Sequence, residues 1–160
     1  MATRDQVMSD FASRIGITPL EPDETGLCSL LIDNDFTAFI QLIGNDGLVM
    51  SAGIGIIPDE SAAATCRALL ESNNFWLGSG GFTLSLVPGS LQVLLSGRAE
   101  FANLSGDGLA EIFGRFVTTA SDWRRRLPTI AEDSPSVQLA AADAEAAAQQ
   151  ERQETAFIRV

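Results

Sequence analysis

Apolar residues recur at helical spacing at the start of the chain. Val7, Phe11 and Ile15 follow one another every four residues, a spacing typical of an amphipathic helix. Thr3 stands at an N-cap position, and Gly16 stands where a helix often ends. The pattern predicts a short helix over about residues 3–15.

A different pattern, typical of strands, follows. Three apolar runs are separated by Asx and glycine residues, which favour hairpin turns. They are Leu27–Asp33, Phe36–Ile43 and Leu48–Ile56. Two further runs, Phe82–Val87 and Leu91–Ala99, are joined through a Pro-Gly-Ser turn. The sequence therefore predicts five antiparallel strands, the first three as a meander.

Helical spacing returns twice more. A second helix is expected from Pro58 to about Ser72, with one face made of Ala62, Cys66, Leu69 and Leu70. A third is expected to end at Pro128, with a longer apolar face made of Leu109, Ile112, Phe113, Phe116, Val117, Ala120, Trp123 and Leu127. The order α-β-β-β-α-β-β-α predicts an α+β fold, a twisted antiparallel sheet with helices packed on it.

The chain length of 160 residues corresponds to one domain. We expect that domain to span residues 3–128. Residues 129–160 form an extension with a hinge at Ser134-Pro135-Ser136, an alanine-rich stretch that is helical or mobile, and an apolar end. An apolar end on such an extension is expected to dock on another surface.

Composition excludes much chemistry. The net charge is −11, all ten basic residues are arginine, and the chain has no Lys, His or Tyr. Without histidine there is no Ser–His or Cys–His dyad, and without lysine there is no Schiff base. An acidic chain repels phosphate backbones, so we expect no nucleic-acid partner. We also expect no catalytic residues, no cofactor and no metal.

The acidity is uneven along the chain. Residues 1–60 carry a net charge of −8, residues 61–130 a net charge of +1, and the remaining residues −4. Cys28 and Cys66 make no disulfide framework, which suits a reducing cytosol, and both fall on apolar faces as small core residues. We expect no targeting segment, because the residues before the first predicted helix include no apolar run. The uncharged stretch Ser72–Gly97 alternates apolar residues with Ser and Thr, so it is interpreted as strands and a turn rather than a membrane span.

Four short motifs have both a functional and a structural interpretation. Gly53-Ile54-Gly55 lacks the third glycine of a dinucleotide fingerprint, which favours a bend or bulge. Gly78-Ser79-Gly80-Gly81 is interpreted as a connector. Asp33 and Asp35 flank Asn34, which favours a turn over a cation site. Arg124-Arg125-Arg126 suits the negative end of a helix, and the alternative is a docking point for an acidic partner segment.

The first two predicted strands carry apolar residues on both faces. Leu27 and Leu31 lie opposite Cys28, Leu30 and Ile32 on the first strand. On the second, Phe39 and Ile43 lie opposite the other apolar positions, Phe36, Ala38, Ile40 and Leu42. A sheet with one solvated face alternates more cleanly. Helices, a second subunit or a bound segment must therefore cover part of this surface.

Three motifs resemble those of the class I type III secretion chaperones, the family of Tir-chaperone-like proteins. They are Gly26-x-Cys28-x-Leu30-x-Ile32-Asp33, Leu69-Leu70-x-x-Asn73 and Phe116-Val117-x-x-Ala120-x-x-Trp123-x-x-x-Leu127. Length, acidity and element order agree with that family over residues 3–128. The resemblance implies a bacterial, cytoplasmic, virulence-associated chaperone that binds the N-terminal segment of a secreted effector and keeps it soluble.

The resemblance also implies two sets of site residues. It implies a homodimer whose interface includes Ala64, Ala68, Leu69, Phe75, Trp76, Leu91 and Val93. It places the effector segment, bound as an extended chain that adds a strand to a sheet edge, on Val7, Phe11, Ile15, Leu27, Leu31, Phe36 and Phe39. One alternative is a regulatory protein of the same fold that exchanges partners to couple secretion to transcription. A more remote alternative is a small enzyme that uses carboxylates.

Overall fold

The computed structural model describes residues 3–133 and contains one five-stranded antiparallel sheet. The strands are β1 (Leu27–Ile32), β2 (Phe36–Ile43), β3 (Gly47–Ile56), β4 (Thr83–Leu86) and β5 (Gln92–Glu100). Their spatial order is β1-β2-β3-β5-β4, so β1 and β4 are the two edges. The predicted meander and the second hairpin are both confirmed.

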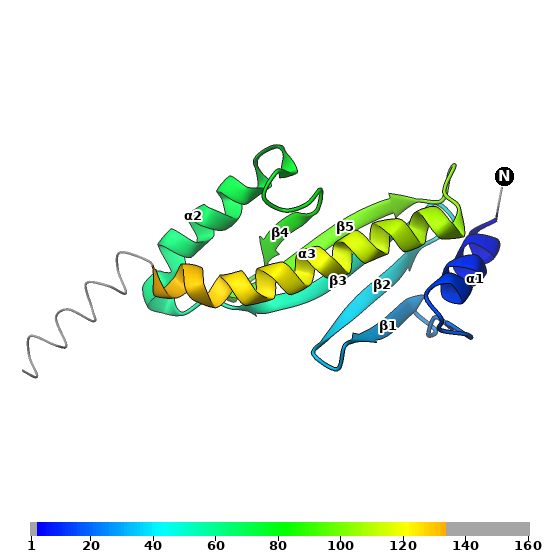
Figure 1. Cartoon of the computed structure of the whole chain (residues 1–160), viewed down its shortest axis with the longest axis horizontal. Coiled ribbons are helices and arrows are strands. Elements are labelled where there is room, and N and C mark those ends of the chain that lie inside the picture. The colour runs from blue at the N-terminus through cyan, green and yellow to red at the C-terminus, as the bar shows by residue number, and fades with distance from the viewer. Residues whose placement is uncertain (1–2, 134–160) are drawn as a thin grey trace, which may run out of the picture.

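Three helices accompany the sheet. They are α1 (Arg4–Arg14), α2 (Ala62–Asn73) and α3 (Gly106–Glu132), with single 3-10 turns η1 (Asp59–Ser61) and η2 (Asn74–Trp76) on either side of α2. The long α3 lies along one face of the sheet, α1 lies beside its N-terminal half, and α2 begins near its C-terminal end (Figure 1). This order confirms the predicted α-β-β-β-α-β-β-α arrangement.

The core lies between α3 and the inner face of the sheet. Phe36, Ala38 and Ile40 alternate into it from β2 and are buried. The buried face of α3 follows the predicted spacing through Leu109, Phe113, Phe116, Ala120, Trp123 and Leu127. Burying large apolar side chains contributes about 1.5–3 kcal/mol each, so this layer is the main source of stability.

The first helix is fixed at both ends and packs closely on α3. The Thr3 hydroxyl accepts a hydrogen bond from the Gln6 N–H at 3.3 Å, and Gly16 has a φ of +74°, as predicted for the cap positions. The rings of Phe11 and Phe113 meet edge to face with centroids 5.4 Å apart. Close approach is possible because Gly106 has no side chain: a Cβ there would lie 2.3 Å from the Asp10 Cβ.

Two of the ambiguous motifs are turns or bulges. Asp33 and Asn34 have φ values of 48° and 56°, and the Asp35 N–H donates to the Ile32 carbonyl at 2.8 Å, which closes the β1–β2 hairpin. The register of β3 on β5 shifts between Gly53 and Gly55, which is a β-bulge. The structural interpretation of both motifs is therefore confirmed.

The third helix extends beyond its predicted end. Pro128 lies inside α3, which continues to Glu132. Proline removes one helical hydrogen bond, but Leu127 and Ala131 are both buried on the same helix face, and this packing keeps the last turn in place. The boundary expected at residue 128 therefore falls within a helix. The predicted hinge, alanine-rich stretch and apolar end lie in 134–160, outside the described residues.

Candidate partner-binding surfaces

The β1 edge of the sheet has unused backbone groups. The Gly26 carbonyl accepts from Leu42 and the Ile32 carbonyl accepts from Asp35, so even-numbered residues of β1 direct their backbone groups toward β2. Odd-numbered residues therefore direct theirs outward. Asp23 occupies the outward groups of Leu27: its N–H donates to the Leu27 carbonyl, and its Oδ1 accepts from the Leu27 N–H, both at 2.9 Å. The outward groups of Ser29 and Leu31 have no partner among residues 3–133.

The β4 edge is largely closed by side chains. The Leu84 N–H donates to the Asn73 Oδ1 at 2.9 Å, and the Asn73 Nδ2 donates to the Leu84 carbonyl at 2.8 Å. Two residues earlier, just before β4, the Phe82 N–H donates to the Ser79 carbonyl at 3.0 Å, and the Ser79 hydroxyl donates back to the Phe82 carbonyl. Side chains and loop backbone thus occupy the outward groups of Phe82 and Leu84, and of the outward groups of β4 only those of Leu86 have no partner among residues 3–133. The β1 edge, with Ser29 and Leu31, is the more open of the two.

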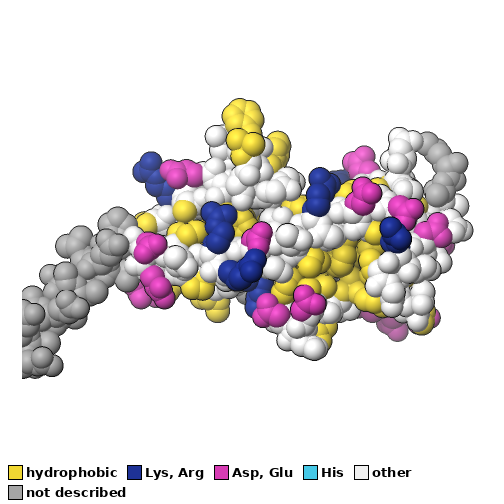
Figure 2. Space-filling view, viewed as in Figure 1, with side chains coloured by type: hydrophobic (Ala, Val, Ile, Leu, Met, Phe, Trp, Pro, Cys, Tyr) yellow, Lys and Arg dark blue, Asp and Glu magenta, His cyan; other side chains and the backbone are white. Residues whose placement is uncertain are grey.

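Four of the seven predicted partner-binding residues are accessible. Leu31 is 63% exposed, and Ile15, Leu27 and Phe39 are half-buried. Leu27, Leu31 and Phe39 lie on the face of the sheet opposite α3. On that face Phe39 is paired across the strands with Ser29, and Leu31 with Thr37. An apolar strip is also visible between α3 and the β1–β2 hairpin on the near face (Figure 2).

The other three predicted partner-binding residues belong to the core. Val7, Phe11 and Phe36 are buried within the chain, the first two beneath α3 and the last beneath Arg124. Their apolar pattern arises because the protein's own helix covers them. A bound segment therefore cannot contact these side chains in this arrangement.

An apolar tip projects beyond α2. We use this name for Phe75, Trp76 and Leu77, which are 80%, 56% and 85% exposed. Hydrophobic side chains gather at this projecting end of the molecule (Figure 2). Phe75 and Trp76 have φ values of 50° and 54°, a conformation that bulky residues seldom adopt. Such a backbone persists only where its surroundings fix it, and strained exposed aromatics of this kind are typical of interaction sites.

Hydrogen bonds fix Gly78, the residue that follows the apolar tip. The indole Nε1 of the buried Trp123 donates to the Gly78 carbonyl at 3.1 Å, and the Gly78 N–H donates to the Ser72 carbonyl at 3.0 Å. Together with Asn73 at the β4 edge, these bonds join α2, the tip, β4 and α3. The tip is therefore held in a fixed position.

The predicted dimer-interface residues divide in the same way. Phe75 and Trp76 are exposed, and Ala64, Ala68 and Leu91 are half-buried. Leu69 and Val93 are buried in the core of the single chain. The sequence reasoning missed Leu77 and Leu70, which are both largely exposed. Leu70 was expected beside Leu69, but a helix turns by about 100° per residue and carries it outward.

The three arginines near the end of α3 have partners within the chain. Arg124 donates to the Gly53 carbonyl at 3.0 Å and to Asp35 at 3.3 Å, and its guanidinium lies 5.1 Å from the centre of the Phe36 ring. Arg125 pairs with Asp122, and Arg126 lies over the Trp123 ring. These contacts favour the structural interpretation over an acidic docking point.

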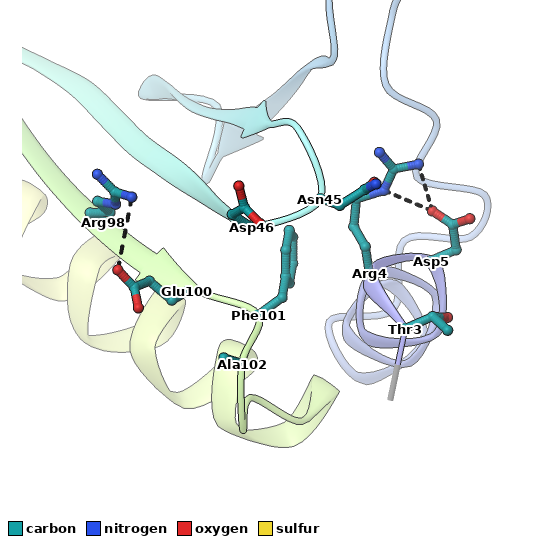
Figure 3. Close-up of a pocket in the computed structure, with 9 residues that line it drawn as sticks. All are labelled: Thr3, Arg4, Asp5, Asn45, Asp46, Arg98, Glu100, Phe101 and Ala102. Carbon is teal, nitrogen blue, oxygen red and sulfur yellow. Dashed lines mark hydrogen bonds and ion pairs between the residues drawn. The ribbon is translucent and has the colours of Figure 1, made fainter. Parts of the chain in front are cut away.

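A polar hollow of about 780 Å³ lies where α1 meets the β2–β3 turn and the end of β5 (Figure 3). Arg4 pairs with Asp5 at 2.9 Å, and Arg98 lies 3.8 Å from Glu100. The Arg4 guanidinium also donates to the Gly44 carbonyl at 3.3 Å. Both arginines are thus already matched by carboxylates, and the hollow is a polar surface between secondary-structure elements.

Within residues 3–133 no group of three His, Cys, Asp or Glu side chains could hold a metal ion. In the same part of the chain, no helix is long and apolar enough to cross a membrane. The features that stand out are an open sheet edge and an exposed apolar tip. They define a class of protein that acts by binding other polypeptides.

The Tir chaperone protein (CesT) family matches residues 6–124. Because this match spans most of the chain, the protein belongs to that family, and the resemblance found in its sequence motifs is confirmed. No curated protein matches the chain in sequence.

Several solved structures of protein complexes contain a chain of similar fold. A chain of the ExsC–ExsE complex superposes with a TM-score of 0.63 at 23% identity, over 77% of this chain and 92% of its own. The Yersinia pestis type III secretion chaperone SycH, in complex with a fragment of YscM2, gives 0.60 at 23% identity over 73% and 96%. The HopA1–SchA chaperone–effector complex gives 0.61 at 20% identity over 76% and 92%. These likenesses confirm the predicted fold class.

Proposed function

We propose that this protein is a cytoplasmic, homodimeric chaperone that binds an extended segment of a secreted effector and keeps it soluble. The open edge of β1 carries this proposal. Membership of a chaperone family supports it, and the related folds occur in complexes with effector or partner proteins. The function needs binding alone and no catalytic group.

Strand addition explains how β1 would hold such a segment. The outward N–H and C=O groups of Ser29 and Leu31 supply main-chain hydrogen bonds that depend little on the partner's sequence. The side chains of Leu27, Leu31 and Phe39 add apolar contacts on the outer face. A segment held in this way is extended, paired and shielded from aggregation.

The apolar tip supports a dimer. Three large side chains exposed side by side are unusual for a monomer and typical of an interface between subunits. Leu70, near the end of α2, is a further large apolar side chain that is exposed. A second copy of the chain would cover these residues and present a second β1 edge to the same partner.

The strand-addition proposal is tested at Ser29. Ser29→Pro removes an outward N–H without removing a β1–β2 hydrogen bond, because proline is tolerated at strand edges. The matched control is Ser29→Ala, which keeps the N–H. Each form is co-expressed with a candidate effector encoded beside the chaperone, and the soluble effector that co-purifies is measured. We expect loss for proline and retention for alanine, with both variants keeping the unmodified circular dichroism spectrum. Equal recovery with both variants contradicts the proposal.

The dimer is tested by light scattering coupled to size exclusion. We expect twice the chain mass for the unmodified protein and a shift to monomer for Leu77→Asp, since a charge would be buried in the interface. Ile43→Asp places the same charge at an exposed apolar position on β2 and should leave the dimer intact. A monomeric unmodified chain at micromolar concentration contradicts this part of the proposal.

A further inference from the structure

We infer that the segment bound along β1 is a strand of about six residues with an apolar centre and a basic residue at each end. This inference rests on the proposed function, and it adds the chemistry by which the edge selects its partner.

The sheet half that contains β1 has no positive charge of its own. Between Arg14 and Arg67 the chain has eight acidic residues and no basic one. Arg14 forms an ion pair with Asp107 at 3.4 Å, and Arg4 forms one with Asp5. Arg124 reaches this region from α3, but it lies against Asp35. The β1 edge therefore lies in a negative potential that favours a cationic partner.

The acidic residues are placed at the two ends of the edge. Glu21, Asp23 and Glu24 immediately precede β1, and Asp33 and Asp35 follow it. Because a strand rises about 3.3 Å per residue, the six residues of β1 separate these groups by roughly 20 Å. A partner strand of about six residues reaches both ends.

Among residues 3–133, Glu24 and Asp33 are the carboxylates nearest the two ends of β1 that have neither an ion pair nor a hydrogen bond. Asp35 is paired with Arg124, and Asp23 accepts hydrogen bonds from the Thr25 hydroxyl and N–H and from the Leu27 N–H at 2.7–2.9 Å. These bonds hold the pKa of the Asp23 carboxyl below its ordinary value, so this end of the edge stays negative. Glu24 and Asp33 are exposed, one at each end.

Apolar side chains lie on both faces of β1, with Ser29 between Leu27 and Leu31 on the outer face and Leu30 beside Ile32 on the inner face. A strand beside β1 places alternate side chains next to Leu31 on the outer face and next to Ile32 on the inner face. Leu31 is largely exposed and Ile32 is half-buried, so each gains from an apolar neighbour. An apolar centre with basic ends matches the whole edge.

The test uses two capped, fluorescent peptides. One reads Arg-Val-Thr-Val-Thr-Val-Arg, and its twin has glutamate at both ends. Affinity for the full chain is measured by anisotropy at about 20 mM and about 500 mM salt, where the Debye length falls from roughly 20 Å to roughly 4 Å. We expect about a tenfold preference for the arginine peptide at low salt, since two exposed ion pairs form where the twin has two repulsions. The preference should largely disappear at high salt.

Three variants locate the effect. The double substitution Glu24→Gln and Asp33→Asn should reduce the preference to about threefold or less; asparagine tolerates the positive φ at position 33, so the turn is kept. Glu132→Gln removes an acid at the far end of α3 and should change nothing. Ser29→Pro should abolish binding of both peptides.

The possible failures are distinguishable. Equal affinity for both peptides, with binding still abolished by Ser29→Pro, overturns the charge inference and leaves the proposed function standing. Binding of neither peptide, or binding that Ser29→Pro does not change, contradicts strand addition at β1, on which both proposals depend.

Discussion

Asn73 closes one edge of the sheet, so its removal should destabilise the α2–β4 region. Asn73→Ala deletes the two hydrogen bonds to the Leu84 backbone, of 2.8 and 2.9 Å. A typical hydrogen bond contributes a net ~0.5–1.5 kcal/mol, so we expect the free energy of unfolding to fall by about 1–3 kcal/mol. Asn73→Asp keeps the acceptor for the Leu84 N–H but places a second oxygen against the Leu84 carbonyl. The loss should therefore be of similar size.

Urea denaturation measures this loss. The buried Trp123 gives a fluorescence signal for the same region, because its indole bonds to the connector that follows Asn73. With a slope of about 1–3 kcal/mol per molar urea, the midpoint should fall by roughly 1 M at fixed protein concentration. Asn74→Ala is the matched control, since no side-chain hydrogen bond of Asn74 occurs among the described residues. A loss below about 0.5 kcal/mol, or an equal loss for Asn74→Ala, would refute the reasoning, because each bond should contribute at least that much.

Three further predictions concern the core. The valine side chain in Gly106→Val should clash with Asp10 and separate α1 from α3. We expect the free energy of unfolding, measured by thermal or urea denaturation, to fall by ~1–3 kcal/mol. An unchanged stability contradicts the close approach. The Thr65 hydroxyl is buried without a partner among residues 3–133, so Thr65→Val should leave stability unchanged or raise it by up to about 1 kcal/mol, and a clear loss would show an unseen hydrogen bond. Burial and the charge of Asp23 raise the pKa of the Cys28 thiol. Thiol reagents should therefore label Cys28 more slowly than the half-buried Cys66, and the labelling of Cys28 should become faster as pH rises. Equal labelling rates for the two cysteines contradict this.

Local signals in the sequence were sufficient for the secondary structure. Val7 and Phe11 repeat at helical spacing behind the Thr3 cap, and Asp33 with Asn34 occupies the positive-φ positions of a tight hairpin. These features depend on residues close together in the chain, so the pattern alone predicts them. The type and order of the elements predicted within residues 3–133 are confirmed.

Exposure depends on tertiary packing and was harder to predict. An apolar face on α1 has the same pattern whether its cover is α3 or a bound partner, and Phe11 is buried by Phe113. A proline usually ends or kinks a helix, yet α3 continues past Pro128 because Ala131 is buried against the core. The open edge at Ser29 became apparent only when the direction of the backbone hydrogen bonds was known.

The contrast between the two sheet edges explains how one chain can bind a strand without polymerising. An open edge pairs with other open edges, and on the β4 side Asn73 and Ser79 occupy the outward groups of Leu84 and Phe82 and leave only those of Leu86. The β1 edge therefore offers the longer run of free groups for pairing between two copies of the described domain. Antiparallel pairing of two β1 edges would bring the Glu24 end of one copy against the Asp33 end of the other, and both ends are acidic. The same carboxylates that favour a basic-ended strand therefore disfavour self-pairing at this edge, since like charges across an interface oppose association.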